Sequence, residues 1–154
     1  MDSQDTGGVA LLAIHPRFVS AIMDGRKKVE FRRRAFARKV RHVVVYETSP
    51  TMKVVGYFQV QRITSGRPRS LWRRFRSVAG IRWEDYKSYF SGTDEAFAIG
   101  IAAAWRLETP LELTALGDAL VPPQGYRYLE SAAIDILRQA LPGENKAALA
   151  ARVP

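Results

Sequence analysis

Residues 24–34, Asp24-Gly25-Arg26-Lys27-Lys28-Val29-Glu30-Phe31-Arg32-Arg33-Arg34, constrain the fold of this chain more than any other stretch. The glycine follows a short amphipathic segment, residues 16–23, and glycine is common where a helix ends. The alternation of charged and apolar residues after it predicts a strand over residues 27–33. This stretch therefore joins the end of a helix directly to a strand that carries several charges.

Side-chain alternation along this strand predicts two different faces. Lys28, Glu30 and Arg32 are expected to share one face, and Val29 and Phe31 are expected to point into a core. Glu30 stands alone among cations, and ion pairing would fix the geometry of its neighbours.

Lys27 lies where the strand begins, so its side chain can turn toward either face. We interpret Lys27 and Glu30 as an ion pair that belongs to a ligand site, in which a paired lysine acts as an electrostatic clamp. The alternative is an exposed surface pair, which would contribute little to stability. A role for Lys27 as a general base would require burial and a lowered pKa.

Turn signals separate the remaining apolar segments. Strands are predicted at residues 9–14, 43–48, 53–63, 96–105 and 111–113, a structured loop at 121–128, and helices at 16–23, 68–78, 83–90 and 129–141. Glycines at positions 56 and 100 predict bulges. We predict an α+β fold with a small, mostly antiparallel β-barrel of about five to six strands and flanking helices. Residues 1–8 are expected to be a disordered leader, residues 9–142 one domain, and residues 143–154 a frayed tail.

The positive charge is concentrated in one part of the chain. The net charge is +9, and 16 of the 24 Lys and Arg residues lie in residues 26–76, where the acids are Glu30 and Glu47. Such an excess is the electrostatic footprint of a polyanion binder. The alternative is a compositional bias toward arginine on solvated faces. Glu47 could share one cleft with Lys27 and Glu30, where two acids and a lysine could catalyse hydrolysis or hold a divalent metal. The alternative is that Glu47 is a solvent-exposed residue of an edge strand.

Arginines and tyrosines supply further candidates for contacts with nucleic acid. The predicted helix that begins near residue 68 places Arg69, Arg73 and Arg76 opposite its apolar side chains. Tyr57 lies on the polar face of a strand that is expected to be half solvated, so it is the candidate for stacking on a base.

Several classes of function are disfavoured. The chain has no cysteine, which excludes disulfides and thiolate metal sites. His15 and His42 are isolated, so no metal site is expected, and no phosphate loop or dinucleotide motif indicates a cofactor. The polar first residues do not form a signal peptide, and the longest apolar run is too short to cross a bilayer. We therefore expect a soluble, cytoplasmic protein without a membrane partner.

The sequence resembles the ASCH (ASC-1 homology) domains of the PUA-like superfamily. The resemblance rests on a Gly-x-Lys-x-x-Glu-x-Arg box, here Gly25, Lys27, Glu30 and Arg32. It follows His15-Pro16 and a helix, as in the family, and it extends from about residue 9 to residue 130. Further matching segments are Tyr46 to Pro50, Val54 to Phe58, Ala96 to Ile101 and Pro122 to Gln124.

The resemblance implies a PUA-like barrel with a cleft beside the first helix, lined by the Lys-Glu-Arg box. Members are associated with RNA or DNA binding, ribonuclease activity and hydrolysis of acetylcytidine, and bacterial members are often labelled predicted transcriptional regulators. The acetylcytidine amidohydrolases use a lysine, a threonine and a glutamate. Lys27 matches their lysine, but Glu30 stands where they have the threonine.

Three hypotheses follow. The first is a nucleic-acid-binding module, for RNA or single strands rather than duplex DNA, that uses Lys27, Lys28, Glu30, Arg32, Arg34, Tyr57, Arg69, Arg73 and Arg76. The second is a small hydrolase, a ribonuclease or a nucleoside amidohydrolase, with Lys27, Glu30 and Glu47 in the same cleft. The third is a domain whose basic face meets an acidic protein. The sequence does not predict the oligomeric state.

Overall fold

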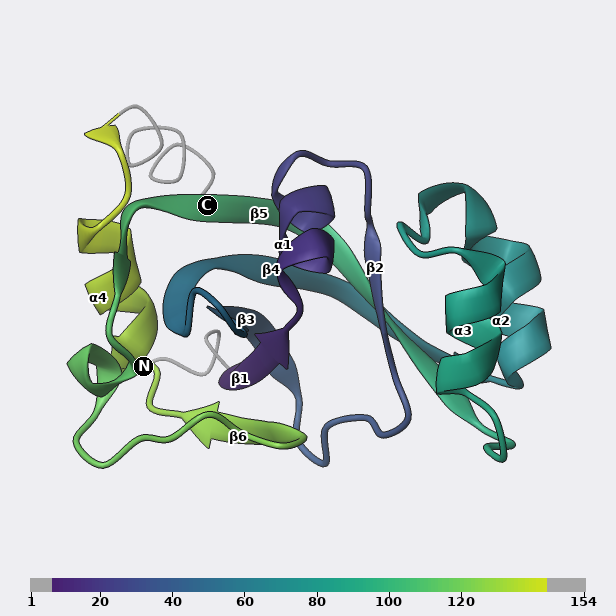
Figure 1. The fold of residues 1–154 in the computed structure, drawn as a ribbon. Coiled ribbons are helices and arrows are strands. Elements are labelled where there is room, and N and C mark those ends of the chain that lie inside the picture. Colours follow the sequence, from purple (N-terminus) through teal and green to yellow (C-terminus); the bar gives the residue numbers. More distant parts are fainter. Residues whose placement is uncertain (1–6, 144–154) are drawn as a thin grey trace.

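A computed structural model describes residues 7–143, which form one curled sheet with helices packed around it (Figure 1). The strands are β1 (Gly8–Ile14), β2 (Val29–Arg32), β3 (Val40–Glu47), β4 (Lys53–Gly66), β5 (Ala96–Leu111) and β6 (Tyr126–Leu129). The helices are α1 (Pro16–Met23), α2 (Pro68–Phe75), α3 (Trp83–Tyr89) and α4 (Ala132–Gln139), and short 3-10 turns lie at η1 (Arg76–Val78) and η2 (Leu113–Leu116).

The order of strands across the sheet is β2-β5-β4-β3-β1-β6. Neighbouring strands are antiparallel except β1 and β3, which are parallel and are connected through α1 and β2. Within residues 7–143 no ladder joins the two edge strands, β2 and β6, so the barrel stays open. The α+β prediction of a mostly antiparallel sheet with flanking helices is confirmed.

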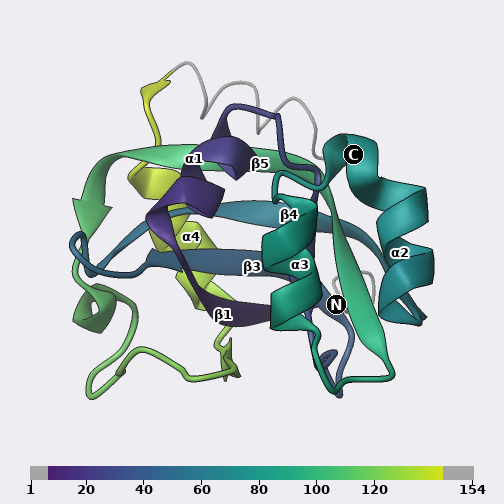
Figure 2. The ribbon, with the colours of Figure 1, turned by 45° about the vertical axis from the view of Figure 1, so that its right-hand side comes forward.

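Three apolar clusters hold the elements together. The helix α4 covers one face of the sheet through Ile134 and Leu137, and α1 covers the other through Val19 and Ile22. The third cluster joins α2 and α3 to β2 and to the first part of β5. Figure 2 shows α3 on the same side of the molecule as α1, with α2 farther out.

A bulge at Gly56 changes the predicted alternation of β4. The register shifts between Val54 and Gly56 in the ladder with β5, which confirms the predicted irregularity. A side chain at position 56 would collide with the backbone oxygen of Trp105. Tyr57 consequently shares a cluster with Val54, whereas Phe58 belongs to the cluster on the other face.

The prediction that Tyr57 is accessible for base stacking is wrong. Tyr57 is 0% exposed, and its ring stacks on that of Trp105 with centroids 4.9 Å apart. The cause is tertiary, because α4 packs over this half of β4 and turns the expected solvent face into core. Residues 54–58 of β4 are buried, and the expected partial exposure begins at Gln59.

Other differences concern boundaries. The predicted loop at 121–128 contains the start of β6, Leu111 ends β5 instead of starting a separate strand, and η2 begins at Leu113. The irregular pairing near Gly100 arises on β4, between Val60 and Ile63. Gly8 already belongs to β1; the rest of the predicted leader, except Gly7, and the predicted tail beyond Gly143 lie outside the described residues. Within the described part, no helix is long and apolar enough to pass through a bilayer.

Candidate functional site

The connection from α1 to β2 places the Lys-Glu-Arg box. Asp24 caps α1, Gly25 adopts φ +85°, and the backbone N–H of Lys27 donates back to the carbonyl of Ala21 at 2.9 Å. Few residues other than glycine adopt this left-handed conformation at low cost. The prediction that a helix ends near Gly25 and is followed by a charged strand is confirmed, with α1 ending at Met23 and β2 running from Val29 to Arg32.

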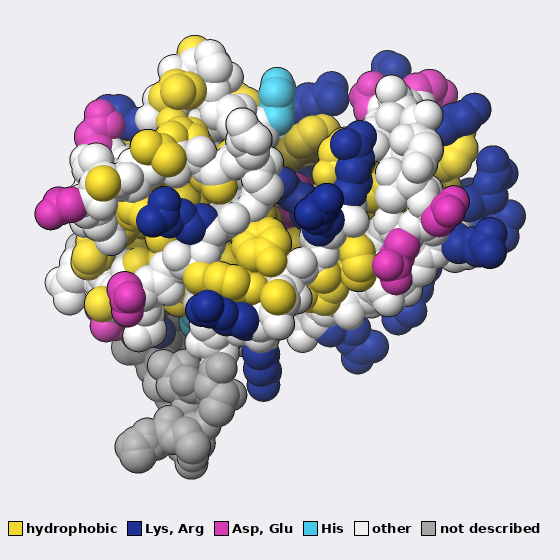
Figure 3. Space-filling model, turned by 90° about the horizontal axis from the view of Figure 1, so that it is seen from below, with side chains coloured by type: hydrophobic (Ala, Val, Ile, Leu, Met, Phe, Trp, Pro, Cys, Tyr) yellow, Lys and Arg dark blue, Asp and Glu magenta, His cyan; other side chains and the backbone are white. Residues whose placement is uncertain are grey.

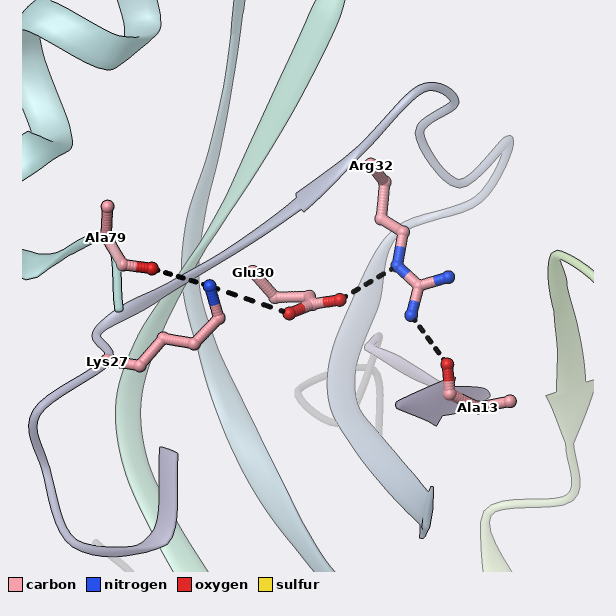
Figure 4. Close-up of polar contacts among 5 residues, drawn as sticks. All are labelled: Ala13, Lys27, Glu30, Arg32 and Ala79. Carbon is pink, nitrogen blue, oxygen red and sulfur yellow. Dashed lines mark hydrogen bonds and ion pairs between the residues drawn. The ribbon is translucent and has the colours of Figure 1, made fainter. Parts of the chain in front are cut away.

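Lys27 is buried, not exposed at a strand start. Only 2% of its surface is accessible, and its Nζ donates to the carbonyl of Ala79 at 2.6 Å (Figure 4). The same nitrogen lies 4.0 Å from Glu30 Oε1 and about 5 Å above the ring centres of Phe18 and Phe31. A carbonyl, a carboxylate and two aromatic faces thus surround the ammonium, all of which favour a cation.

Gly80 makes the burial of Lys27 possible. It has φ +61°, and a Cβ added there would lie 2.5 Å from Lys27 Cβ and 2.7 Å from Lys27 Cγ. The aliphatic part of the lysine therefore packs directly on the glycine backbone. The chain after α2 fixes the lysine from two sides, through contact at Gly80 and through the hydrogen bond to Ala79.

Glu30 and Arg32 continue this line of polar contacts. Arg32 Nε donates to Glu30 Oε2 at 3.1 Å, and an Nη donates to the carbonyl of Ala13 at the end of β1 at 2.9 Å. Glu30 is 6% exposed, so the alternative interpretation, an exposed surface pair, is wrong. The carboxylate bridges two cations, and Figure 4 shows the run from Ala79 through Lys27, Glu30 and Arg32 to Ala13.

Burial lowers the pKa of Lys27 below its usual value of 10.5. The carboxylate of Glu30 acts in the opposite direction and raises this pKa, whereas the charge of Arg32 lowers it further. Desolvation is the largest of these effects, because removal of water penalises the charged form of the amine. Burial and the direction of the pKa shift of Lys27 are those that a general base would require.

A pocket of about 280 Å³ opens beside this box, and we call it the lysine pocket. Three segments line it: the end of β1 with the start of α1, then β2, then the region of α3. Its lining residues are Ala13, Ile14, His15, Arg17, Phe18, Lys27, Glu30, Phe31, Arg32, Ile81, Asp85, Tyr86 and Tyr89. Basic side chains gather around a hollow near the middle of the face in Figure 3, with apolar side chains beside them.

The lysine pocket includes side chains that the sequence argument did not select. Phe18 and Arg17 come from the first turn of α1, and Tyr86 and Tyr89 come from α3. Arg17 and Asp85 approach to 3.6 Å across the space between the two helices. No local pattern links these positions, since they are separated by more than sixty residues in the sequence. His15 lies between β1 and α1, where its Nδ1 accepts from the N–H of Arg17.

The other candidate residues do not join Lys27, Glu30 and Arg32. Glu47 accepts a hydrogen bond from Thr51 Oγ1 and does not line the lysine pocket, so the structure does not bring the two glutamates together. Lys28 turns away from Glu30 and lines a different pocket. Arg34, Arg69, Arg73 and Arg76 are exposed and lie outside both pockets. Tyr57 is in the core.

Residues 7–143 contain no group of three or more His, Asp or Glu side chains arranged to hold a metal ion. The polar side-chain groups of the lysine pocket are two guanidinium groups, one ammonium, two carboxylates, an imidazole and two tyrosine hydroxyls. The site can accept hydrogen bonds at Glu30, donate them from Arg17 and Arg32, and contact a flat ring with its aromatic side chains.

Comparisons with known proteins agree with this architecture. The crystal structure of ASCH from Zymomonas mobilis superposes with a TM-score of 0.79 at 27% identity, covering 88% of this chain and 96% of that chain. The N-terminal domain of McrB from Staphylothermus marinus shares the fold, with a TM-score of 0.56 at 11% identity over 90% of this chain and 98% of that one.

Two relatives are similar in sequence. A protein of Zymomonas mobilis named ASCH domain-containing ribonuclease is 34% identical over 90 residues, which are 58% of this chain and 61% of that protein. The large ribosomal subunit protein uL22 of Ureaplasma parvum serovar 3 is 30% identical over 128 residues, 82% of this chain and 41% of that protein. The chain thus spans less than two thirds of the length of either relative.

The family model of the ASCH domain matches residues 12–110, from the middle of β1 to the end of β5. The matched part contains the complete Lys-Glu-Arg box and every residue that lines the lysine pocket. On the sequence match, the fold and the position of the box, this chain belongs to the ASCH domain family.

Proposed function

We propose that this chain is an RNA-binding domain that holds one unpaired nucleobase in the lysine pocket. One observation carries the proposal: a buried carboxylate, a guanidinium and several aromatic rings line the same small pocket, and the carboxylate and the guanidinium come from the most basic stretch of the chain. Single-stranded RNA is usually read in this way, by stacking of a base and by hydrogen bonds to its edge.

The polar groups suit the edge of a base. Glu30 uses its two oxygens for Arg32 and Lys27, and a carboxylate has further lone pairs that can accept from an amino or imino N–H. Arg32 keeps N–H groups beyond those given to Glu30 and Ala13, and these can donate to a base oxygen or nitrogen. Donors and acceptors side by side distinguish one base edge from another.

The aromatic groups and the volume suit a single ring system. Phe18 and Tyr89 are half-buried on two sides of the lysine pocket and take the stacking role that the sequence argument gave to Tyr57. Stacking on an aromatic side chain contributes about 1–3 kcal/mol per base. A volume of about 280 Å³ lies at the lower limit of ligand pockets, about 300 Å³, and suits a base rather than a large cofactor.

The surrounding charge suits the phosphate backbone. Arg69, Arg73 and Arg76 are exposed along α2 and η1, and we call them the basic helix face. Arg34 lies two residues beyond the end of β2. Phosphate contacts supply most of the affinity of a nucleic-acid-binding protein without distinguishing sequences, so these arginines add affinity and the lysine pocket adds selectivity. The ribonuclease named among the relatives is consistent with RNA as the partner.

Binding of single-stranded RNA, single-stranded DNA and duplex DNA at low and high salt tests the proposal. We expect single-stranded RNA to bind most tightly and Arg32→Gln to weaken binding by about 1–3 kcal/mol in a base-dependent way. The matched control is Arg26→Gln, which removes the same group from an exposed position outside the lysine pocket. Replacing the three arginines of the basic helix face with Gln should weaken all single strands about equally and flatten the salt dependence.

Preference for duplex DNA, or equal effects of Arg32→Gln and Arg26→Gln, would contradict a base-reading pocket. If replacement of Arg69, Arg73 and Arg76 with Gln leaves the affinity for RNA unchanged, these arginines do not contact RNA.

A second function, RNA cleavage or hydrolysis of a modified nucleoside, is favoured by the burial of Lys27. A general base has to be desolvated and to have a lowered pKa, and burial moves the pKa of Lys27 in that direction. The same samples are therefore analysed for products, with acetylcytidine as a further substrate and with or without magnesium or manganese. Turnover that disappears in Lys27→Met would replace the binding-module proposal with the hydrolase.

A further inference from the structure

A second pocket, about 390 Å³ in volume, lies on the other side of β2, and we call it the arginine pocket. It is formed by the start of β2, the second half of β4, the first part of β5 and the end of α2. Lys28, Arg62 and Arg74 line it, and all three are exposed. No carboxylate is among its lining residues, in contrast to the lysine pocket.

The three cations have no acidic partner within residues 7–143. Cations around one hollow repel each other, and an anion placed among them removes that repulsion. Gln61 and Thr64 add neutral donors to the same lining. Cationic and neutral hydrogen-bond donors of this kind bind phosphate oxygens. The lining contains no carboxylate, whose negative charge would repel a phosphate.

The backbone positions these groups. The register of β4 shifts between Val60 and Ile63, opposite Gly100 of β5. A Cβ at Gly100 would lie 3.1 Å from the carbonyl oxygen of Arg62, so glycine lets the irregular segment approach closely and brings Arg62 to the pocket. Arg74 lies with its Cζ 5.2 Å from the ring centre of Phe75, a contact that holds the guanidinium beside the opening.

Consecutive lysines connect the two pockets. The side chain of Lys27 enters the lysine pocket, and that of Lys28 lines the arginine pocket. The segment that follows α2 separates them, because the carbonyl of Val78 accepts from the N–H of Lys28 at 2.9 Å and that of Ala79 accepts from Lys27 Nζ. The two pockets are therefore lined from opposite sides of one short segment of the chain.

We propose that the arginine pocket binds a backbone phosphate of the RNA strand whose base occupies the lysine pocket. The inference rests on the proposed function, which it extends by a second contact point with different chemistry. Lys28, Arg62 and Arg74 neutralise the phosphodiester, and Gln61 and Thr64 donate to its oxygens or to the neighbouring ribose.

The test compares two variants of equal charge. In the first, Lys28, Arg62 and Arg74 are all replaced with Gln. In the control, the exposed residues Arg41, Arg106 and Arg127 are replaced with Gln. None of these residues lines the arginine pocket. Arg41 lies in β3, Arg127 lies in β6, the edge strand farthest from β2, and Arg106 lies about 20 Å along β5 from Gly100. Both variants lower the net charge by the same amount, so a difference between them is a local effect.

Affinity for single-stranded RNA of mixed sequence is measured over a range of salt concentrations, and for a series of lengths from a dinucleotide upward. The loss of three phosphate-binding cations should reduce the slope of log affinity against log salt by about 2, at about 0.7 per contact. Affinity at low salt should fall about tenfold or more, and this loss should be absent for strands too short to reach both pockets. The control should change the slope far less.

An equal effect of the two triple variants, or no effect of the first, would overturn the arginine pocket as a phosphate site. Arg32→Gln measured alongside separates the two proposals. If it still weakens RNA binding, the proposed function stands and only the second contact fails. If the unmodified chain binds no RNA, both fail.

Discussion

Gly80→Ala tests whether the turn after α2 fixes the position of Lys27. The substitution has two costs. At φ +61° an alanine adopts the left-handed conformation, which costs about 1–2 kcal/mol. The new Cβ would also lie 2.5 Å from Lys27 Cβ, and overpacking of this kind typically costs about 1–3 kcal/mol more.

Gly92→Ala is the matched control. Gly92 also has a positive φ, +78°, but a Cβ added there has no heavy atom within 4 Å. This control isolates the backbone cost, and the difference between the two variants measures the contact with Lys27. We expect Gly80→Ala to lose about 1–3 kcal/mol more in the free energy of unfolding than Gly92→Ala.

Urea denaturation of both variants gives this difference, provided that the dependence on denaturant is unchanged. RNA binding is measured on the folded variants. Gly80→Ala should weaken it, because the aliphatic part of Lys27 must move and the hydrogen bond to Ala79 is disturbed. Equal losses of stability in the two variants would refute the argument that Gly80 holds the lysine in place.

Two further predictions concern pH. Between the lowered pKa of Lys27 and 10.5, the unfolded chain binds the lysine proton and the folded chain does not, so the free energy of unfolding should rise with pH in that window. Lys27→Met should remove this rise, which is measured as the difference between the stability-versus-pH curves of the variant and of the unmodified chain. Burial raises the pKa of Tyr86 to about 12, so between about pH 10 and about pH 12 this tyrosine is ionised in the unfolded chain but not in the folded chain, and stability should fall over that range. Tyr86→Phe should reduce the fall, and it also removes the hydrogen bond to the carbonyl of Pro68.

Local patterns were sufficient to predict the part of the site that is contiguous in sequence. The end of α1 near Gly25, the strand that follows, and the grouping of Glu30 with Arg32 all depend on turn preference and on the two-residue repeat of a strand. The α+β fold also followed from the spacing of short strands and helices. These features need no knowledge of distant contacts.

Burial could not be predicted in the same way, because it depends on which distant segments pack over a residue. Lys27 looks like an exposed cation in the sequence, and it is buried because Ala79 and Gly80 close over it. Tyr57 looks half solvated, and it is buried because α4 covers that part of β4. In both cases the covering segment lies more than fifty residues away in the sequence.

This burial changes which substitution is informative at Lys27. For an exposed pair, replacement with alanine would test binding alone, since such a pair contributes at most about 1 kcal/mol to folding. For a buried lysine, replacement with alanine also creates a cavity and removes a cationic partner of Glu30, so both stability and binding should decrease. Methionine keeps most of the volume and so avoids the cavity, although Glu30 keeps only Arg32 as a cationic partner and the carbonyl of Ala79 loses its donor. A loss of RNA binding in Lys27→Met without a loss of stability would therefore assign the ammonium to the ligand rather than to the fold.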